Sequence, residues 1–156
     1  RSTEDLLYFG GIFYALPDGT EIRRVRSGQF SPNGIGLSPC EKWLYWADSY
    51  TGRLWRCAIE APGRLSDAVL PMPGQVVATL PGYQMLDSLA VEREGLVCVA
   101  TMVNGGITIF DESGVSEHVK IGLGGLYAVN FVPGALKAAY GDSPNGAMAF
   151  VRLKIE

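Results

Sequence analysis

Asn33 and Asp87 are two residues whose side-chain oxygens and positions make them candidates for chemistry. An amide oxygen and a carboxylate are ligands that hard cations such as Ca²⁺, Mg²⁺ or Mn²⁺ prefer, and a carboxylate can also accept a proton from water. Two such ligands do not complete a tight cation site. On spacing alone, the pattern favours a structural interpretation, in which Asn33 serves an Asn-Gly turn and Asp87 caps a loop.

Both residues begin segments of a repeated strand-turn-strand pattern. The first segment is Pro32-Asn33-Gly34-Ile35-Gly36-Leu37 followed by Trp43-Leu44-Tyr45-Trp46-Ala47-Asp48, and looser versions cover 87–101 and 127–143. They recur at roughly 40 to 50 residues, the period of a four-stranded propeller blade. Because a propeller arranges the starts of its innermost strands around one channel, the pattern predicts that Asn33 and Asp87 meet in space.

Turn residues divide the rest of the chain into short apolar runs typical of strands. The predicted strands are 6–9, 11–16 and 22–26, then two complete blades (34–37, 43–47, 54–59 and 76–80; 88–91, 96–100, 106–110 and 117–121), then 127–131, 136–140 and 148–153. The segment 61–74 is predicted to be a long loop. No window shows the apolar periodicity of a helix. The predicted fold is therefore all-β, a partial β-propeller of about three four-stranded blades, forming a single domain over residues 1–156 with no separate second domain.

This strand count is too small for a closed ring, because a single propeller needs at least four blades. An open stack of blades leaves the apolar faces of its two end blades uncovered, so a second copy, a further segment or another protein must cover them. We therefore expect self-association as a homodimer or a higher oligomer.

Composition and charge exclude several classes of protein. The formal net charge is -3, and the densest basic group, around Arg23 and Arg24, alternates between the two faces of a strand. Nucleic acid is therefore not an expected partner. No apolar run reaches the length of a membrane span, and no signal peptide is visible. The expected localisation is cytoplasmic, with secretion left open because the chain begins at Arg1.

The three cysteines, Cys40, Cys57 and Cys98, form no CxxC motif, and their number is odd. Cys57 and Cys98 lie in apolar strands, where a free cysteine behaves as a small hydrophobic residue. Cys40 lies in a turn and is expected to be exposed. Free thiols in a reducing compartment are the expected state.

Nearly the whole chain resembles the family of senescence marker protein 30, gluconolactonase and luciferin-regenerating enzyme, which are six-bladed propellers. The resemblance is carried by Gly11-Ile12-Phe13-Tyr14, Pro17-Asp18-Gly19, Pro32-Asn33-Gly34, Ser38-Pro39, Leu44-Tyr45-Trp46-Ala47-Asp48-Ser49, Gly52-Arg53-Leu54-Trp55-Arg56, and Asp87 with Ala90-Val91-Glu92 and Glu94-Gly95-Leu96. The chain looks like the C-terminal half of such a protein. The family's Ser-Pro-Asp-Gly turn is Ser38-Pro39-Cys40-Glu41 here, a difference expected to be structural.

The resemblance implies a divalent metal (Ca, Mg, Mn or Zn) at the channel floor and lactone hydrolysis as the chemistry. It assigns Asn33 and Asp87 as metal ligands, although Leu86 and Ser88 replace the Pro and Gly that flank the family's Asp. With a metal polarising the lactone carbonyl, Asp87 is also the candidate catalytic residue, accepting a proton from water. The family's N-terminal Glu ligand, and its substrate-holding Arg and Asn, have no counterpart in this sequence.

Other polar residues fit structural roles better. Asp48-Ser49 and Asp142-Ser143 each follow a second strand, which is typical of turn-forming Asp residues that bind nearby backbone amides. His118, the only histidine, falls in an outer strand and is expected at the surface, where it completes no nucleophilic triad. The segment 83–85 is expected either to line the channel mouth or to be a plain loop.

Two function classes follow. In the first, the chain is a metal-dependent lactone hydrolase of the gluconolactonase type, acting on a small lactone or sugar-derived substrate and weak or inactive as a lone chain. In the second, it is a non-catalytic binding or scaffold module derived from a truncated propeller enzyme. The retained Asn33 and Asp87 favour the first class, and the missing ligands favour the second.

Overall fold

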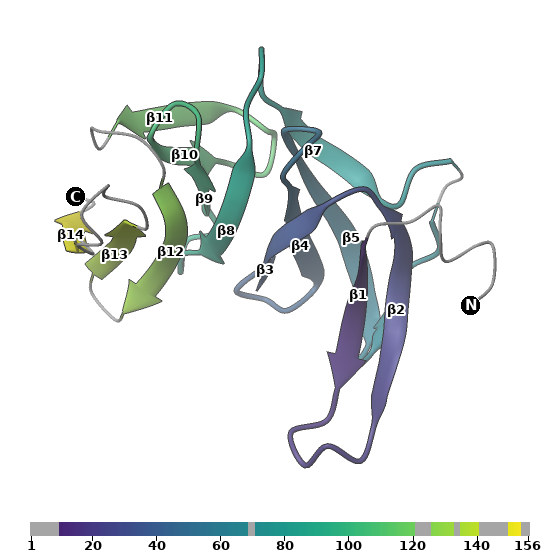
Figure 1. Ribbon diagram of the computed structural model, residues 1–156. Helices are drawn as coiled ribbons and strands as arrows, with labels where there is room; N and C mark the ends of the chain where they lie inside the picture. Colours follow the sequence, from purple (N-terminus) through teal and green to yellow (C-terminus); the bar gives the residue numbers. More distant parts are fainter. Residues whose placement is uncertain (1–9, 69–70, 121–125, 133–134, 141–149, 154–156) are drawn as a thin grey trace.

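The computed structural model describes residues 10–68, 71–120, 126–132, 135–140 and 150–153, and this part of the chain consists of β-strands joined by turns (Figure 1). The strands are β1 Gly10–Ala15, β2 Ile22–Gln29, β3 Pro32–Leu37, β4 Trp43–Asp48, β5 Arg53–Ala61, β6 Arg64–Leu65, β7 Gln75–Thr79, β8 Leu86–Val91, β9 Val97–Thr101, β10 Gly106–Phe110, β11 Ser116–Lys120, β12 Leu126–Val132, β13 Ala135–Tyr140 and β14 Phe150–Leu153. Within these residues there is no helix that is long and apolar enough to cross a membrane. The all-β prediction is confirmed.

Within the described part of the chain, four antiparallel sheets follow one another. β1 pairs with β2, β3 begins the second sheet, β8 to β11 form the third in simple sequence order, and β12 to β14 form the fourth. The predicted strands of the two complete blades match β3, β4, β5 and β7 and then β8 to β11. The predicted strand 6–9 lies outside the described residues, as do residues 121 and 148–149.

The second sheet contains one strand that the sequence did not predict. β7 pairs with the first half of β5, at Arg53–Arg56, whereas the two-residue β6 pairs with its last residues, Ile59 and Ala61. The chain reverses at Pro62-Gly63, where Gly63 has a φ of 67°. β5 extends beyond the residues that pair with β7, so the last amides and carbonyls of β5 need another partner. The hairpin that joins β5 to β6 supplies this partner.

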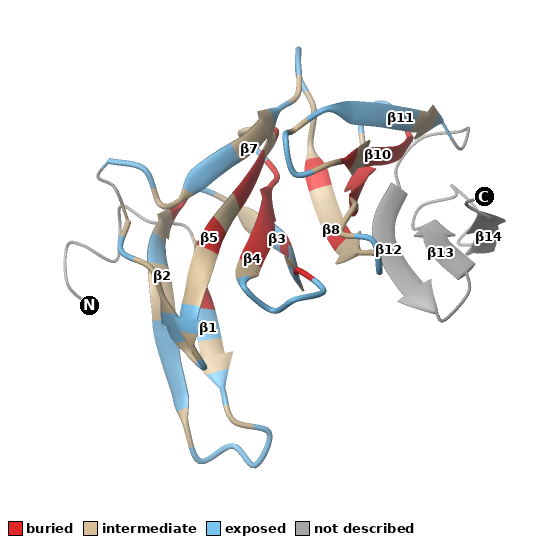
Figure 2. Ribbon diagram, turned by 180° about the vertical axis from the view of Figure 1, so that it is seen from behind, coloured by how far each residue is buried: buried red, intermediate tan, exposed pale blue. Residues whose placement is uncertain are grey.

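Two apolar clusters fill the spaces between the sheets. Side chains alternate across a strand, and β4 therefore contributes Leu44 and Trp46 to one cluster and Tyr45 and Ala47 to the other. The first cluster is completed by Ile12, Trp55 and Cys57, and the second by Leu54, Leu86, Leu89, Val97, Val99 and Phe110. Figure 2 shows the buried residues concentrated on β4, β5 and β10, and every residue of β9 is also buried.

The sheets are stacked so that their first strands lie together. β3 lies beside β8, and β8 lies beside β12 (Figure 1). Meander sheets stacked through apolar faces, with their first strands adjacent, give a propeller-like arrangement. This arrangement places the starts of β3 and β8 next to each other.

Hydrogen bonds to Ser38 close the turn between β3 and β4. The Glu41 amide donates to the Ser38 carbonyl at 2.8 Å, and the Trp43 amide donates to the Ser38 hydroxyl at 3.0 Å. Glu41 has a φ of 56°, a left-handed conformation that costs a non-glycine residue roughly 1–2 kcal/mol. The expectation that the departure from the family's Ser-Pro-Asp-Gly turn is structural stays a prediction.

The cysteines are where the sequence predicted. Cys57 and Cys98 are buried in β5 and β9, Cys40 is exposed in the turn, and all three thiols are free. Burial, the larger influence, and the nearby Glu92 carboxylate together raise the pKa of the Cys98 thiol to about 12. Cys98 therefore acts as a small apolar residue of the core.

Candidate functional site

Asn33 and Asp87 occupy matching irregular positions near the starts of β3 and β8. In each strand, one extra residue is inserted relative to the neighbouring strand, just after the first pair of the ladder. The pairs that flank the insertions are Pro32–Asp48 and Ile35–Trp46 for β3, and Leu86–Thr101 and Leu89–Val99 for β8. Bulges of this kind redirect a side chain away from the regular alternation of a strand.

Gly34 brings the two bulges together. A Cβ atom on Gly34 would lie 2.3 Å from the Leu89 amide nitrogen and 2.5 Å from the Asp87 carbonyl oxygen. These contacts are with backbone, so no side-chain movement can relieve them, and only glycine allows β3 to approach β8 this closely. Gly34 is therefore required for this strand contact, which places Asn33 beside Asp87.

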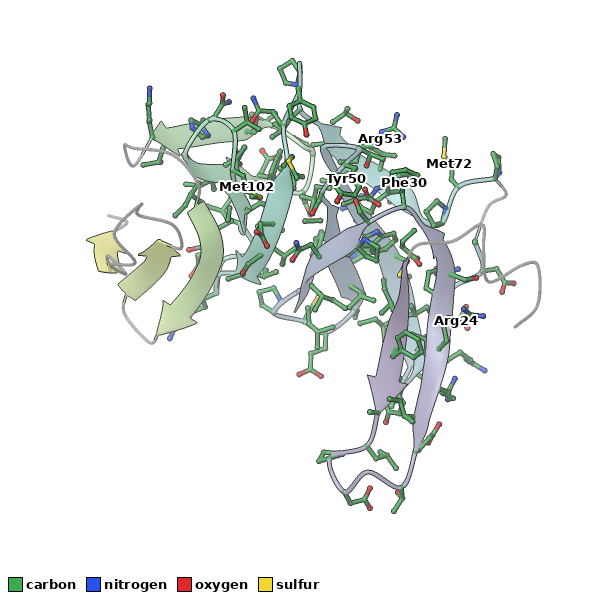
Figure 3. All side chains as sticks on the ribbon, in the orientation of Figure 1. Arg24, Phe30, Tyr50, Arg53, Met72 and Met102 are labelled. Carbon is green, nitrogen blue, oxygen red and sulfur yellow. The ribbon has the colours of Figure 1, made fainter. Side chains whose placement is uncertain are left out.

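Asn33 and Asp87 line one pocket of about 500 Å³. Its full lining is Gly10, Phe30, Ser31, Pro32, Asn33, Ser49, Tyr50, Met85, Asp87 and Met102. Figure 3 labels Phe30 and Tyr50 next to each other, with Met102 farther along on the side of β8. The predicted meeting of the two polar residues in space is confirmed.

A short chain of hydrogen bonds orders the polar part of this pocket. The Asn33 amide nitrogen Nδ2 donates to the Ser49 hydroxyl at 3.3 Å, and that hydroxyl donates to the Leu86 carbonyl at 2.6 Å. The Asn33 side chain also hydrogen-bonds to the Asp87 carboxylate. Because its amide nitrogen is directed at Ser49, Asn33 can offer its carbonyl oxygen Oδ1 to a ligand.

Burial raises the pKa of Asp87 above the ordinary value of 3.8, although hydrogen bonds from the Ser88 amide and the Asn33 side chain oppose this rise. The negative charge on Asp87 is thus held where it is poorly solvated. A carboxylate of raised pKa is a better proton acceptor, and a cation placed beside it would gain electrostatic stabilisation.

The pair fits the chemistry of a hard cation without completing its coordination. Both side chains offer oxygen, which suits Ca²⁺, Mg²⁺ or Mn²⁺. Among the described residues, no group of three or more His, Cys, Asp or Glu side chains gathers in one place. Further ligands must therefore come from water, substrate or other residues. The metal and catalytic roles of Asn33 and Asp87 stay predictions.

Asp48 has the turn-forming role that the sequence predicted, and it reaches farther than expected. Its carboxylate accepts hydrogen bonds from the amide and hydroxyl of Thr51, at 3.3 and 3.0 Å, in the following turn. It also accepts the amides of Phe30 and Ser31, both at 3.1 Å, from the turn before β3. The predicted counterpart, Asp142-Ser143, lies outside the described residues.

Of the other candidate residues, Met85 lines the pocket and His118 does not. His118 is exposed on β11, with its Nδ1 3.1 Å from the Thr108 hydroxyl, and it does not line the pocket. Met85 lines the pocket, whereas Tyr83 is exposed and contacts Met85 through its hydroxyl, 3.3 Å from the sulfur. The segment 83–85 therefore reaches the pocket through Met85.

The pocket residues that sequence reasoning missed include Phe30, Ser49, Tyr50 and Met102. One signal was available for Ser49 and Tyr50, because they directly follow Asp48 at the end of the second strand of a repeated unit. Phe30 lies in the turn before β3, and Met102 lies in the turn after β9. No sequence motif marks either residue.

The fold and this pocket define an all-β, propeller-like protein with oxygen-bearing side chains gathered where its first strands meet. The sequence model of the SMP-30/gluconolactonase/LRE-like region matches residues 1–135, and the chain belongs to this family. Lactonase drp35 of Staphylococcus aureus (strain bovine RF122 / ET3-1) is 28% identical over 105 residues, which are 67% of this chain and 32% of that protein. The chain therefore spans about a third of the length of this curated relative.

Solved structures of the family share the fold. Regucalcin of Agrobacterium tumefaciens, described as a calcium-binding protein, aligns with a TM-score of 0.72 at 18% identity, over 89% of this chain and 47% of that one. A gluconolactonase from Xanthomonas campestris aligns with a TM-score of 0.67 at 22% identity, over 84% of this chain and 41% of that one. A luciferin-regenerating enzyme gives 0.69 at 21% identity, over 83% of this chain and 43% of that one.

Proposed function

We propose that this chain forms the catalytic pocket of a divalent-cation-assisted lactone hydrolase of the gluconolactonase type. The observation that carries the proposal is the convergence of Asn33 and Asp87 in one pocket, from matching bulges of two neighbouring inner strands. Membership of the family, and the relatives named lactonase and gluconolactonase, support the same reaction class.

In this proposal, Asn33 and Asp87 hold a divalent cation through the amide oxygen Oδ1 and the carboxylate. The calcium-binding description of the Agrobacterium regucalcin supports Ca²⁺ as one candidate, beside Mg²⁺, Mn²⁺ and Zn²⁺. A bound cation supplies Lewis-acid polarisation of the lactone carbonyl and lowers the pKa of water. Ser49 keeps the Asn33 amide turned so that its oxygen is free for this role.

Asp87 then acts as the proton acceptor for hydrolysis. A water molecule attacks the carbonyl carbon and gives a proton to the Asp87 carboxylate. The carbon–oxygen bond of the ring breaks, and the leaving oxygen takes up the proton. The product is the open hydroxy acid, and Asp87 returns to its ionised form.

The scaffold alternative is less well supported. A binding module with no catalytic role has no need of a poorly solvated carboxylate beside an amide, because such a group lowers stability when it is ionised. Family membership and the retained Asn33–Asp87 pair therefore favour the enzyme.

The test is lactone hydrolysis by protein that has first been stripped of metal with a chelator. We expect activity to return with one of Ca²⁺, Mg²⁺, Mn²⁺ or Zn²⁺, and the same ion to raise the melting temperature, since an ion that binds the folded state stabilises it. Asp87→Asn and Asn33→Ala should each lower kcat/KM about a hundredfold or more and remove the metal-dependent rise in melting temperature.

Asp67→Asn is the matched control, because Asp67 is an exposed carboxylate outside the pocket. It should keep both activity and the metal response. Hydrolysis that is unchanged in Asp87→Asn would contradict the assigned site. An absence of both hydrolysis and metal-dependent stabilisation would favour the scaffold alternative.

A further inference from the structure

The pocket that holds Asn33 and Asp87 has an aromatic mouth, formed by Phe30 and Tyr50. The two rings meet edge to face, with centroids 6.1 Å apart and planes at 73° (Figure 3). Phe30 is 50% exposed and Tyr50 is 62% exposed. Two large rings that line a pocket and present much of their surface to solvent are typical of a ligand-binding wall.

Both rings are carried on turns that one buried carboxylate holds together. Asp48 is 2% exposed and accepts the amides of Phe30 and Ser31 from one turn and the amide of Thr51 from the other. The Tyr50 amide donates to the Ser31 hydroxyl at 2.8 Å, which joins the two turns directly. The backbone beneath the aromatic pair is thus fixed before any ligand arrives, and preorganisation of this kind favours binding.

Two methionines continue the apolar surface from the side of β8 and β9. Met85 and Met102 both line the pocket, and the Met102 amide donates to the Met85 carbonyl at 2.9 Å. The thioether of methionine is polarisable and adaptable, and it makes favourable contacts with aromatic rings. Together the rings and thioethers form an apolar zone around the polar residues Asn33, Ser49 and Asp87.

The lining lacks side chains that would hold an acidic substituent at its aromatic end. Asp87 is the one charged side chain among the described residues that line this pocket, and neither Lys nor Arg is among them. With the proposed cation engaged by the lactone carbonyl, a carboxylate or phosphate placed against Phe30 and Tyr50 would have no described cationic side chain to pair with it. A neutral ligand with an apolar ring fits both the apolar zone of rings and thioethers and the polar residues that it surrounds.

We infer that Phe30, Tyr50, Met85 and Met102 form a subsite for an apolar or aromatic ring carried by a neutral lactone. This inference rests on the proposed function, which places the lactone carbonyl at Asn33 and Asp87. The ring substituent then packs against Tyr50 and Phe30. Lactones with a hydrophobic ring are the preferred substrate class over polyhydroxylated or acidic sugar lactones.

The experiment compares three δ-lactones on the metal-loaded protein: unsubstituted δ-valerolactone, its phenyl-substituted form and glucono-δ-lactone. The phenyl lactone should have a kcat/KM about tenfold above that of the unsubstituted ring. Tyr50→Ala and Phe30→Ala should raise KM for the phenyl lactone about five- to tenfold and leave δ-valerolactone unchanged. Tyr50→Phe should restore the KM. Val115→Ala, which shortens an exposed apolar side chain outside this pocket, is the control.

Binding of the phenyl-substituted δ-lactam, which resists hydrolysis, separates the subsite from the reaction. If the lactam binds and Tyr50→Ala weakens it while no lactone is hydrolysed, the hydrolase proposal fails and the ring subsite stands. If glucono-δ-lactone is the best substrate and Tyr50→Ala changes no KM, the subsite is wrong and the hydrolase stands. If there is neither lactam binding nor hydrolysis, both are overturned.

Discussion

The charge state of Asp87 links the stability of the fold to the chemistry proposed for the site. Because burial is the largest influence on this carboxyl, its pKa is raised in the folded protein. The folded state therefore binds a proton more tightly than the unfolded state does. The stability that comes from the neutral form is present below the ordinary pKa of 3.8 and is lost as the pH rises through the raised pKa.

Asp87→Asn should accordingly melt at a higher temperature than the wild type at pH 7, with chelator present so that no cation neutralises the charge. The difference should shrink as the pH falls through the raised pKa of Asp87, because both proteins are then neutral at this position. Thermal melts followed by circular dichroism between pH 4 and pH 7 measure it. A variant that melts below the wild type at pH 7 would show that the hydrogen bonds from Asn33 and Ser88 matter more than desolvation.

At the scale of elements, the approach of β3 to β8 decides whether the site exists. Gly34→Ala would place a methyl group against the Leu89 amide and the Asp87 carbonyl, both backbone groups. We expect a loss of about 1–3 kcal/mol in the free energy of unfolding, measured by denaturant titration, together with weaker metal stabilisation. Gly36→Ala is the matched comparison, because its Cβ would meet the movable side chains of Leu89 and Val91, and it should be milder. Equal effects of the two changes would contradict this account.

The strands could be predicted from sequence where turn residues mark their ends. Pro17-Asp18-Gly19-Thr20 separates β1 from β2, and Asp111-Glu112-Ser113-Gly114 separates β10 from β11. β6 was not predicted, since a two-residue strand arises from the unsatisfied end of β5 rather than from its own residues. The exact start of β3 also depends on its pairing with β4, and turn-forming residues in the sequence do not reveal this pairing.

The polar half of the pocket was likewise predictable, and its aromatic half was not. Asn33 and Asp87 begin repeated units, and repetition implies proximity around a common centre. Phe30 and Tyr50 reach the pocket because hydrogen bonds to Asp48 hold their turns together. Such long-range contacts leave no periodic trace in the sequence.

At the scale of the whole molecule, the uneven strand numbers of the sheets point to association. Among the described strands, β1 pairs only with β2, and the sheet of β12 to β14 has three strands beside neighbours of four or more. A groove of about 440 Å³ runs between β1 and the β3–β5 sheet, and Phe13, Ile35 and Leu37 are exposed there. We propose that a second copy of the chain covers this apolar surface, completing a partial propeller by self-association.

Light scattering at micromolar concentration should therefore give twice the 16.8 kDa mass of one chain. Phe13→Glu should shift the protein toward monomer, because a charge in the groove opposes the burial of apolar surface, which is worth roughly 25 cal/mol per Å². Val115→Glu is the control, since Val115 is equally apolar and exposed but lies outside the groove, in the turn before β11. A well-folded wild-type monomer, or a dimer unaffected by Phe13→Glu, would contradict this interface. If association also supplies ligands to the cation held by Asn33 and Asp87, lactone hydrolysis per chain should fall on dilution together with the dimer population.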